Sequence, residues 1–145
     1  ILDWGRGVWT YKNVWYWGAG CGIVDNHEVG FNIGYGFGDT SAASENSIFY
    51  DGILHKIEDI TFNIPKDDSG NYLYMKPWTI TSRDKRFEMQ FEPILNRASC
   101  TDIKLICSNQ NQVFGKFNGT MILDDGRKIV LKDFLGFAER VLNKW

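Results

Sequence analysis

The stretch VWYWGAGCGIVDNHEVGFNIGYGFG, Val14–Gly38, decides the fold of this 145-residue chain. Each of its two arms alternates with a period of two residues, which is the spacing of a β-strand whose faces differ. One face of the first arm carries Trp15, Trp17, Ala19 and Cys21, and one face of the second carries Val29, Phe31, Ile33, Tyr35 and Phe37. The opposite faces carry Tyr16, Gly18, Gly20 and Gly22 in the first arm and Gly30, Asn32, Gly34, Gly36 and Gly38 in the second.

The glycines of the two arms predict a surface without side chains. The residues Asp25-Asn26-His27 suit a hairpin loop, and an even register would place Gly18 opposite Gly34 and Gly22 opposite Gly30. Rows of strand glycines mark places where a bulky group lies close to the backbone. We therefore expect a ligand, a helix of the chain itself or another domain to occupy this surface.

Composition limits the class of protein. Apolar residues make up 43% of the chain and aromatic residues 15%, and the net charge of −2 comes from interspersed signs. This balance argues against nucleic acid or an anionic membrane as the main partner, and no apolar run is long enough to span a bilayer. The cysteines Cys21, Cys100 and Cys107 have no CxxC spacing, so we expect a reduced, cytoplasmic setting.

The rest of the chain predicts further strands and one helix. Clean alternation in Arg86–Glu92 predicts a strand, Asn96–Thr101 is expected to be a loop, and Gln112–Leu123 a long strand. Apolar residues then follow a helical stripe in Phe134–Trp145, with Asp133 as the N-cap. About eight to ten strands at hairpin spacing predict an all-β, antiparallel barrel with one C-terminal amphipathic helix. A barrel of about eight strands can hold one small ligand.

Several motifs resemble one known family along the whole chain. They are DWGRGVW at Asp3–Trp9, GFGDTSAASEN at Gly36–Asn46, FYDG at Phe49–Gly52, YMKPW at Tyr74–Trp78, RFEMQFEP at Arg86–Pro93, QVFGKFNG at Gln112–Gly119 and LDDG at Leu123–Gly126. With these motifs the chain resembles the C-terminal portion of the domain-of-unknown-function family 2804, for which the resemblance implies no established reaction.

A more distant resemblance concerns the start of the chain and the block Trp78–Pro93. Here the chain is similar to the carotenoid hydratase and tocopherol cyclase group, whose members pair two lipocalin-like barrels. The resemblance implies that residues 1–145 form a single lipocalin-like (calycin) barrel, the C-terminal half of a longer two-barrel protein. It also implies an N-terminal barrel of the parent chain as a partner. In that group an acidic residue protonates an isoprenoid double bond and aromatic rings stabilise the cation.

The first candidate site lies at Asp3, Trp4 and Arg6. An acid, an aromatic face and a fixed cation lie within a few residues, which suits a proton donor beside a cation-stabilising ring. The alternative is a structural pair of Asp3 with Arg6 and a core position for Trp4, because buried charges are usually paired.

The second candidate site is the polar stretch beside the glycines. Its hydroxyls and carboxylates could form the mouth of a pocket, or they could form a capped turn. We expect Asp39 and Glu45 to contact a ligand there, and Asp51 is a further candidate acid. The remaining expected ligand contacts are Trp17, Asn32, Tyr50 and Trp78.

Metal and cofactor sites are not predicted. His27 and His55 are the two histidines, and neither has a second ligand at metal spacing. The leading hypothesis is a lipocalin-like domain that binds an apolar small molecule or packs on its partner barrel. The alternative is an acid-catalysed hydratase- or cyclase-like enzyme acting on an isoprenoid or lipid-like substrate, with Asp3 or Asp51 as the acid.

Overall fold

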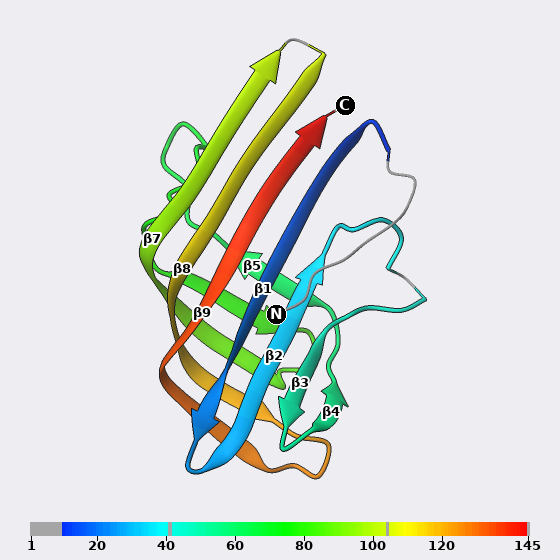
Figure 1. Cartoon of the computed structure of the whole chain (residues 1–145), viewed down its shortest axis with the longest axis vertical. Coiled ribbons are helices and arrows are strands. Elements are labelled where there is room, and N and C mark those ends of the chain that lie inside the picture. Colours follow the sequence, from blue (N-terminus) through cyan, green and yellow to red (C-terminus); the bar gives the residue numbers. More distant parts are fainter. Residues whose placement is uncertain (1–9, 41, 104, 145) are drawn as a thin grey trace.

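The structure, a computed structural model, describes residues 10–40, 42–103 and 105–144, and these residues form one curled antiparallel sheet (Figure 1). The nine-stranded sheet has the order β4-β3-β2-β1-β9-β8-β7-β6-β5. It curls strongly into a half-barrel, which confirms the all-β antiparallel prediction. The strands are β1 Lys12–Val24, β2 His27–Tyr35, β3 Ser47–Tyr50, β4 Ile53–Lys56, β5 Ile60–Asn63, β6 Trp78–Ser82, β7 Phe87–Ile103, β8 Ile106–Ile122 and β9 Lys128–Lys144.

Two strands that follow one another in the chain form the opposite edges of the sheet. β4 and β5 are separated by residues 57–59, yet they lie at the two ends of the strand order. An extended chain from Lys56 to Ile60 spans at most about 14 Å. The short connection therefore requires the sheet to curl until its edges approach each other.

The hairpin between β1 and β2 has a different register from the predicted one. Asp25 and Asn26 alone form the turn, with φ angles of 49° and 66°, which is the geometry of a tight hairpin turn matched to the twist of the strands. Gly18 therefore pairs with Ile33, and Gly34 pairs with Trp17. The prediction of one shared glycine surface is wrong, because the shorter turn places the two glycine rows on opposite faces.

A glycine row does occur on the concave face, but it crosses different strands. Gly136 of β9 pairs with Gly20 of β1 on one side and with Gly115 of β8 on the other. A Cβ atom at Gly20 would lie 3.0 Å from Phe31 Cζ and 3.1 Å from Phe134 Cε1. The bulky groups that need this space are thus phenylalanine rings of the chain itself.

The predicted C-terminal helix is wrong, because this segment belongs to strand β9 and no helix occurs among the described residues. The register of β8 against β9 shifts between Phe117 and Gly119, where Asp133 has a φ of 51°. This bulge places Leu131 and Phe134, three residues apart, both in the core. Within the predicted helix, both faces of β9 carry buried apolar residues, Phe134 and Ala138 on one face and Phe137 and Val141 on the other. Their spacings of three and four residues mimic a helical stripe, which explains the error.

The core occupies the part of the half-barrel that β5 and β6 cover. Trp78, Phe87, Phe91 and Phe117 are all 0% exposed. Neighbouring rings pack with centroids 4.7 Å apart for Phe91 and Phe117 and 5.2 Å apart for Trp78 and Phe91. The chain's own aromatic rings therefore fill this end of the half-barrel.

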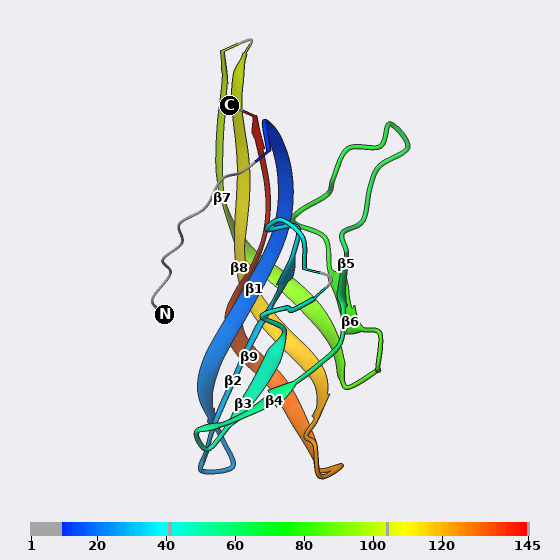
Figure 2. The same cartoon turned by 90° about the vertical axis from the view of Figure 1, so that its right-hand side faces the viewer.

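Beyond the core the sheet continues as a thin extension made of β7, β8, β9 and β1 (Figures 1 and 2). β7 and β8 stay paired to Ile103 and Ile106, so the predicted loop at Asn96–Thr101 is instead part of β7. In the part of the chain that the structure describes, no helix is present that could cross a membrane.

Candidate functional site

The candidate site lies on the concave face, where the filled core gives way to the extension. Register places Tyr16 of β1 beside Arg140 of β9, and Asn111 of β8 on the other side of Arg140. Tyr72 and Tyr74 approach from the segment between β5 and β6. Within that segment a bridge between Lys66 and Tyr72 closes a local turn that carries Tyr72.

Arg140 is the centre of the site. Its Nε donates a hydrogen bond to the Tyr16 hydroxyl at 3.1 Å, and its Nη1 donates to the Tyr74 hydroxyl at 3.5 Å. The guanidinium carbon lies 4.4 Å from the centroid of the Tyr72 ring, within the range of a cation–π contact. Among the described residues no carboxylate forms an ion pair with Arg140.

The pKa of Arg140 is raised even though the side chain is partly buried. Burial alone would lower this pKa, but the hydrogen bonds to Tyr16 and Tyr74 outweigh burial. The guanidinium is therefore a permanent cation whose described partners are neutral phenols.

The tyrosines around Arg140 differ in acidity. Burial and the hydrogen bond with Tyr72 raise the pKa of Tyr16, and burial raises the pKa of Tyr74. The same hydrogen bond, 3.3 Å between the two hydroxyl oxygens, is the main cause of a lowered pKa at Tyr72, and the charge of Arg140 adds to it. The cluster presents a cation and hydroxyl groups to the same space.

The space in front of this cluster is an open groove of about 590 Å³. On its strand side Asn111 donates to Asn109 at 2.8 Å and accepts from Asn96 at 3.0 Å. The Oδ1 atom of Asn96 is buried and has no hydrogen-bond partner. We call this space the Arg140 groove; its lining residues are Gly70, Asn71, Tyr72, Tyr74, Ala98, Ser99, Cys100, Asn109, Gln110, Asn111 and Arg140.

A second hollow of about 420 Å³ lies on the other side of Tyr72. Its walls combine the apolar side chains of Phe62, Ile64 and Pro77, beside the Tyr16 ring, with the polar side chains of Asn63 and Thr79. Lys66 also lines it, with Nζ 4.5 Å from the centroid of the Tyr72 ring. Tyr16 and Tyr72 thus connect a hollow with aromatic and aliphatic walls to the cation in the Arg140 groove.

Three of the expected ligand contacts meet elsewhere, on the opposite, convex face of the sheet. Trp17 Nε1 donates to Asn32 Oδ1 at 2.8 Å, and Asn32 Nδ2 donates to Glu45 Oε2 at 3.3 Å. They lie on the face opposite Tyr16, because Trp17 is its neighbour in β1. The predicted contacts are therefore clustered, but not at the Arg140 groove.

Asp39 lies at an open hollow of about 490 Å³, together with Thr40, Ser44 and Asn46. Asn46 is 1% exposed, and its Oδ1 accepts the Gly34 N–H at 2.7 Å. That bond ties the polar stretch to the backbone of β2. Asp3, Trp4 and Arg6 lie outside the described residues.

Asp51 and Tyr50 belong to the turn between β3 and β4. Asp51 accepts the Glu28 N–H at 2.9 Å and lies 2.6 Å from His27 Nδ1. The hydrogen bond with His27 lowers the pKa of Asp51, which keeps it ionised and disfavours it as a proton donor at neutral pH. Tyr50 is buried and stacks on the His27 ring.

Trp78 is in the core. It is 0% exposed, and its Nε1 donates to the carbonyl oxygen of Tyr74 at 3.0 Å. Trp78 therefore holds the Tyr74 backbone in place from the core. It does not line either hollow beside Arg140.

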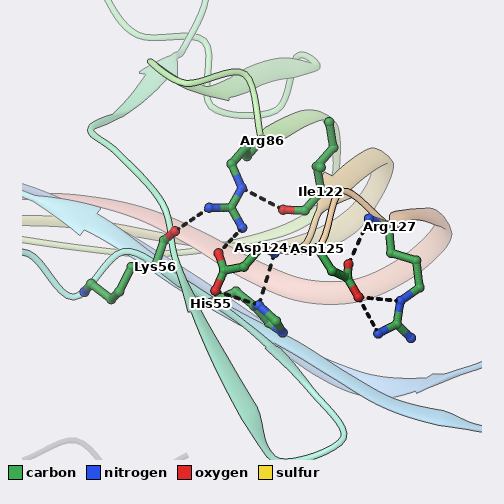
Figure 3. A network of polar contacts seen from close by, with 7 residues as sticks. All are labelled: His55, Lys56, Arg86, Ile122, Asp124, Asp125 and Arg127. Atoms are coloured by element: carbon green, nitrogen blue, oxygen red, sulfur yellow. Dashed lines mark hydrogen bonds and ion pairs between the residues drawn. The ribbon is translucent and has the colours of Figure 1, made fainter.

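A polar network ties the edge strand β4 to the opposite wall of the half-barrel (Figure 3). Arg86 donates to the Lys56 and Ile122 carbonyl oxygens, both at 2.9 Å, and to Asp124 Oδ1 at 2.6 Å. The other carboxylate oxygen of Asp124 lies 3.0 Å from His55 Nδ1. All of these groups have partners within the chain, which indicates that the network joins β4 to the start of β7 and to the turn after β8.

Sequence reasoning missed Arg140 and its tyrosines. The available signal was a pair of adjacent charged residues, Glu139 and Arg140, in an otherwise apolar segment. The helix prediction for this segment hid the signal. In a strand, adjacent side chains point to opposite faces, so they cannot pair with each other. Tyr72 and Tyr74 come from an irregular segment whose position no periodicity predicts.

Comparison with protein families gave a match to a domain of unknown function (DUF2804) over residues 1–145. Searches of curated proteins and of solved structures gave no significant match. The family match confirms the expected resemblance to family 2804. Because the match spans residues 1–145, the chain belongs to the DUF2804 family.

Proposed function

We propose that this domain binds a small molecule that has an apolar body and an anionic group, with the anion at Arg140. The observation that carries the proposal is a partly buried guanidinium without a carboxylate partner among the described residues. Partly buried charges normally have a counter-charge, and a planar guanidinium suits a carboxylate, phosphate or sulfonate. An external anion would supply the missing charge.

The walls on either side of Tyr72 support an apolar body for the ligand. The Tyr16 ring, Phe62 and Ile64 line one hollow, while Arg140 and the asparagines line the other. Small-molecule sites commonly combine mostly apolar walls with a few fixed polar groups, in volumes of about 300–1,000 Å³.

The alternative of an acid-catalysed reaction is less well supported. Such a reaction requires a proton donor beside the substrate. No Asp or Glu is among the described residues that line the Arg140 groove or the adjoining hollow. The chemistry of the site favours binding.

The test is a fluorescence titration of the chain with 1-anilinonaphthalene-8-sulfonate, which carries an aromatic body and a sulfonate. We expect saturable binding at one site and a weakening of about ten- to hundred-fold in Arg140→Met, because a hydrogen bond to a charged group contributes about 1.5–3 kcal/mol. The matched control is Arg127→Met, whose guanidinium pairs with Asp125 at an exposed turn. The control should bind like the wild type.

An uncharged dye of similar size separates charge recognition from simple adsorption. We expect Arg140→Met to change its affinity little. The proposal fails if the sulfonate probe does not saturate, or if Arg140→Met and Arg127→Met weaken its binding equally. Circular dichroism of each variant establishes that the fold is retained.

A further inference from the structure

The upper half of β7 leaves one edge of the sheet unpaired. β7 pairs with β8 up to Ile103, but on its other side β6 pairs only with Glu88–Phe91. Over 95–103, no described residue pairs with the edge of β7 that faces away from β8. In Figure 1 this part of β7 is the outer margin of the extension.

The free edge lacks the usual protection against strand addition. Proteins protect such edges with proline, bulges, charges or a covering segment. Pro93 and a bulge occur where the free edge begins. Beyond them, Arg97 and Asp102 are the only charged residues in the stretch LNRASCTDI, and its residues are partly or fully exposed.

The register shows which backbone groups point outward. The Ile122 N–H donates to the Arg86 carbonyl oxygen at 2.8 Å, so even-numbered residues of β8 form the hydrogen-bonded pairs with β7. After the bulge those residues lie opposite odd-numbered residues of β7. The N–H and C=O groups of the even-numbered residues therefore point to the free edge; these residues are Asn96, Ala98, Cys100 and Asp102.

We propose that this edge pairs with the same edge of a second copy of the chain, antiparallel, about a twofold axis perpendicular to the sheet. Two identical antiparallel edges are complementary by symmetry, because each supplies the same row of donors and acceptors. When residues 95–103 of the two copies overlap fully, Ser99 of one copy faces Ser99 of the other at the twofold axis. The extension of each copy then continues into that of the other as one sheet.

Side chains in this register are compatible. Leu95 and Ile103, which are 59% and 66% exposed, lie opposite each other across the twofold and cover apolar surface. In the same register Arg97 of one copy lies opposite Thr101 of the other, and Asp102 lies opposite Asn96, so no like charges face each other across the twofold. A second copy added in parallel would instead bring the two Arg97 side chains close together.

The first test is sedimentation velocity of the 145-residue chain under reducing conditions. We expect a concentration-dependent dimer and at least tenfold weaker dimerisation in Ala98→Pro, which removes a central outward N–H. The β7–β8 ladder does not use that N–H, and β7 already has a proline at an outward position, Pro93. Ala98→Val keeps the N–H and should dimerise like the wild type.

The second test measures the register and does not depend on a proline. In a chain with Cys21→Ser, Cys100→Ser and Cys107→Ser, we expect Ser99→Cys to form a disulfide-linked dimer on oxidation. Its Cα atom would face its counterpart at about 4.5 Å, within disulfide range. Thr101→Cys in the same background should not crosslink, because its counterpart would lie about 13 Å along the strand.

Three results would overturn the proposal. They are a monomer at every concentration, a dimer of Ala98→Pro as stable as that of the wild type, and equal crosslinking of the Ser99→Cys and Thr101→Cys chains. A monomer that binds an extended peptide at this edge would assign the surface to another class of partner.

Discussion

Gly136→Ala tests the physical basis of the concave glycine row. A Cβ atom at this position would lie 2.6 Å from the Ala19 carbonyl oxygen and 2.9 Å from Phe117 Cε2. Both distances are too short for normal contact, and neither neighbour moves easily, because one is backbone and the other is a ring that is 0% exposed. Strand β9 or the Phe117 ring must therefore shift.

The expected magnitude follows from two opposing effects. Overpacking a filled core costs about 1–3 kcal/mol, while replacing glycine by alanine in an allowed conformation restrains the unfolded chain and returns about 0.4–1 kcal/mol. We expect a net loss of about 1–2 kcal/mol in the free energy of unfolding. For a chain of this size that corresponds to a melting temperature lower by about 2–8 °C.

Urea unfolding followed by tryptophan fluorescence measures this loss, and an unchanged m value would show that the compactness of the two states is unchanged. Gly22→Ala is the matched control. Its Cβ atom would meet only the Phe134 ring, at 3.1 Å and beyond, near the end of β1. We expect it to stay within about 0.5 kcal/mol of the wild type. A Gly136→Ala chain as stable as the wild type would refute the packing argument.

Two further predictions concern a buried hydrogen bond and alkaline pH. Asn46→Ala should lower the free energy of unfolding by about 1–3 kcal/mol, because it leaves the buried Gly34 N–H without its acceptor; Asn63→Ala, at an exposed asparagine, should change it by less than about 0.5 kcal/mol in urea unfolding. Burial raises the pKa of Tyr35 to about 12, so the folded state holds this proton more tightly than the unfolded state does. Its contribution to stability is complete below the unfolded value of 10.0 and is lost as pH rises to about 12. Thermal unfolding across this window should show a smaller loss in Tyr35→Phe, and an equal loss would contradict the assignment.

Local alternation predicted the strands well where one face is buried. Phe87, Met89 and Phe91 are buried and the residues between them are exposed, as their period of two indicates. The expected face of β5 is also correct, since Ile60 and Phe62 are buried. In these segments the pattern depends only on neighbouring residues in the same strand.

The two main errors have different physical causes, the length of one turn and the burial of both faces of one strand. A turn of Asp25 and Asn26 without His27 inverts one arm relative to the other. β9 resembles a helix because apolar residues are buried on both of its faces, Phe134 and Ala138 on one and Phe137 and Val141 on the other. A hydrophobicity pattern does not show the length of the turn, which depends on the φ angles of Asp25 and Asn26, and it does not distinguish a strand buried on both faces from an amphipathic helix.

The Arg140 groove was beyond sequence reasoning for a different reason. Tyr16, Tyr74 and Arg140 are separated by more than 50 residues from one another along the chain. They meet because β1 and β9 are neighbours in the sheet and the segment after β5 folds back over them. A site assembled from three distant segments requires the topology first.

The strand order determines where the chain could be circularly permuted. Apart from the contact of β1 with β9, every neighbour in the sheet is also a neighbour in sequence, and the break between β4 and β5 falls at the two margins. A circular permutant opened at 57–59, with β9 joined to β1, would trace a plain meander from one margin to the other. In the natural connectivity, by contrast, β1 and β9 pair with each other in the middle of the sheet. Removing either strand would therefore divide the sheet into two separate parts.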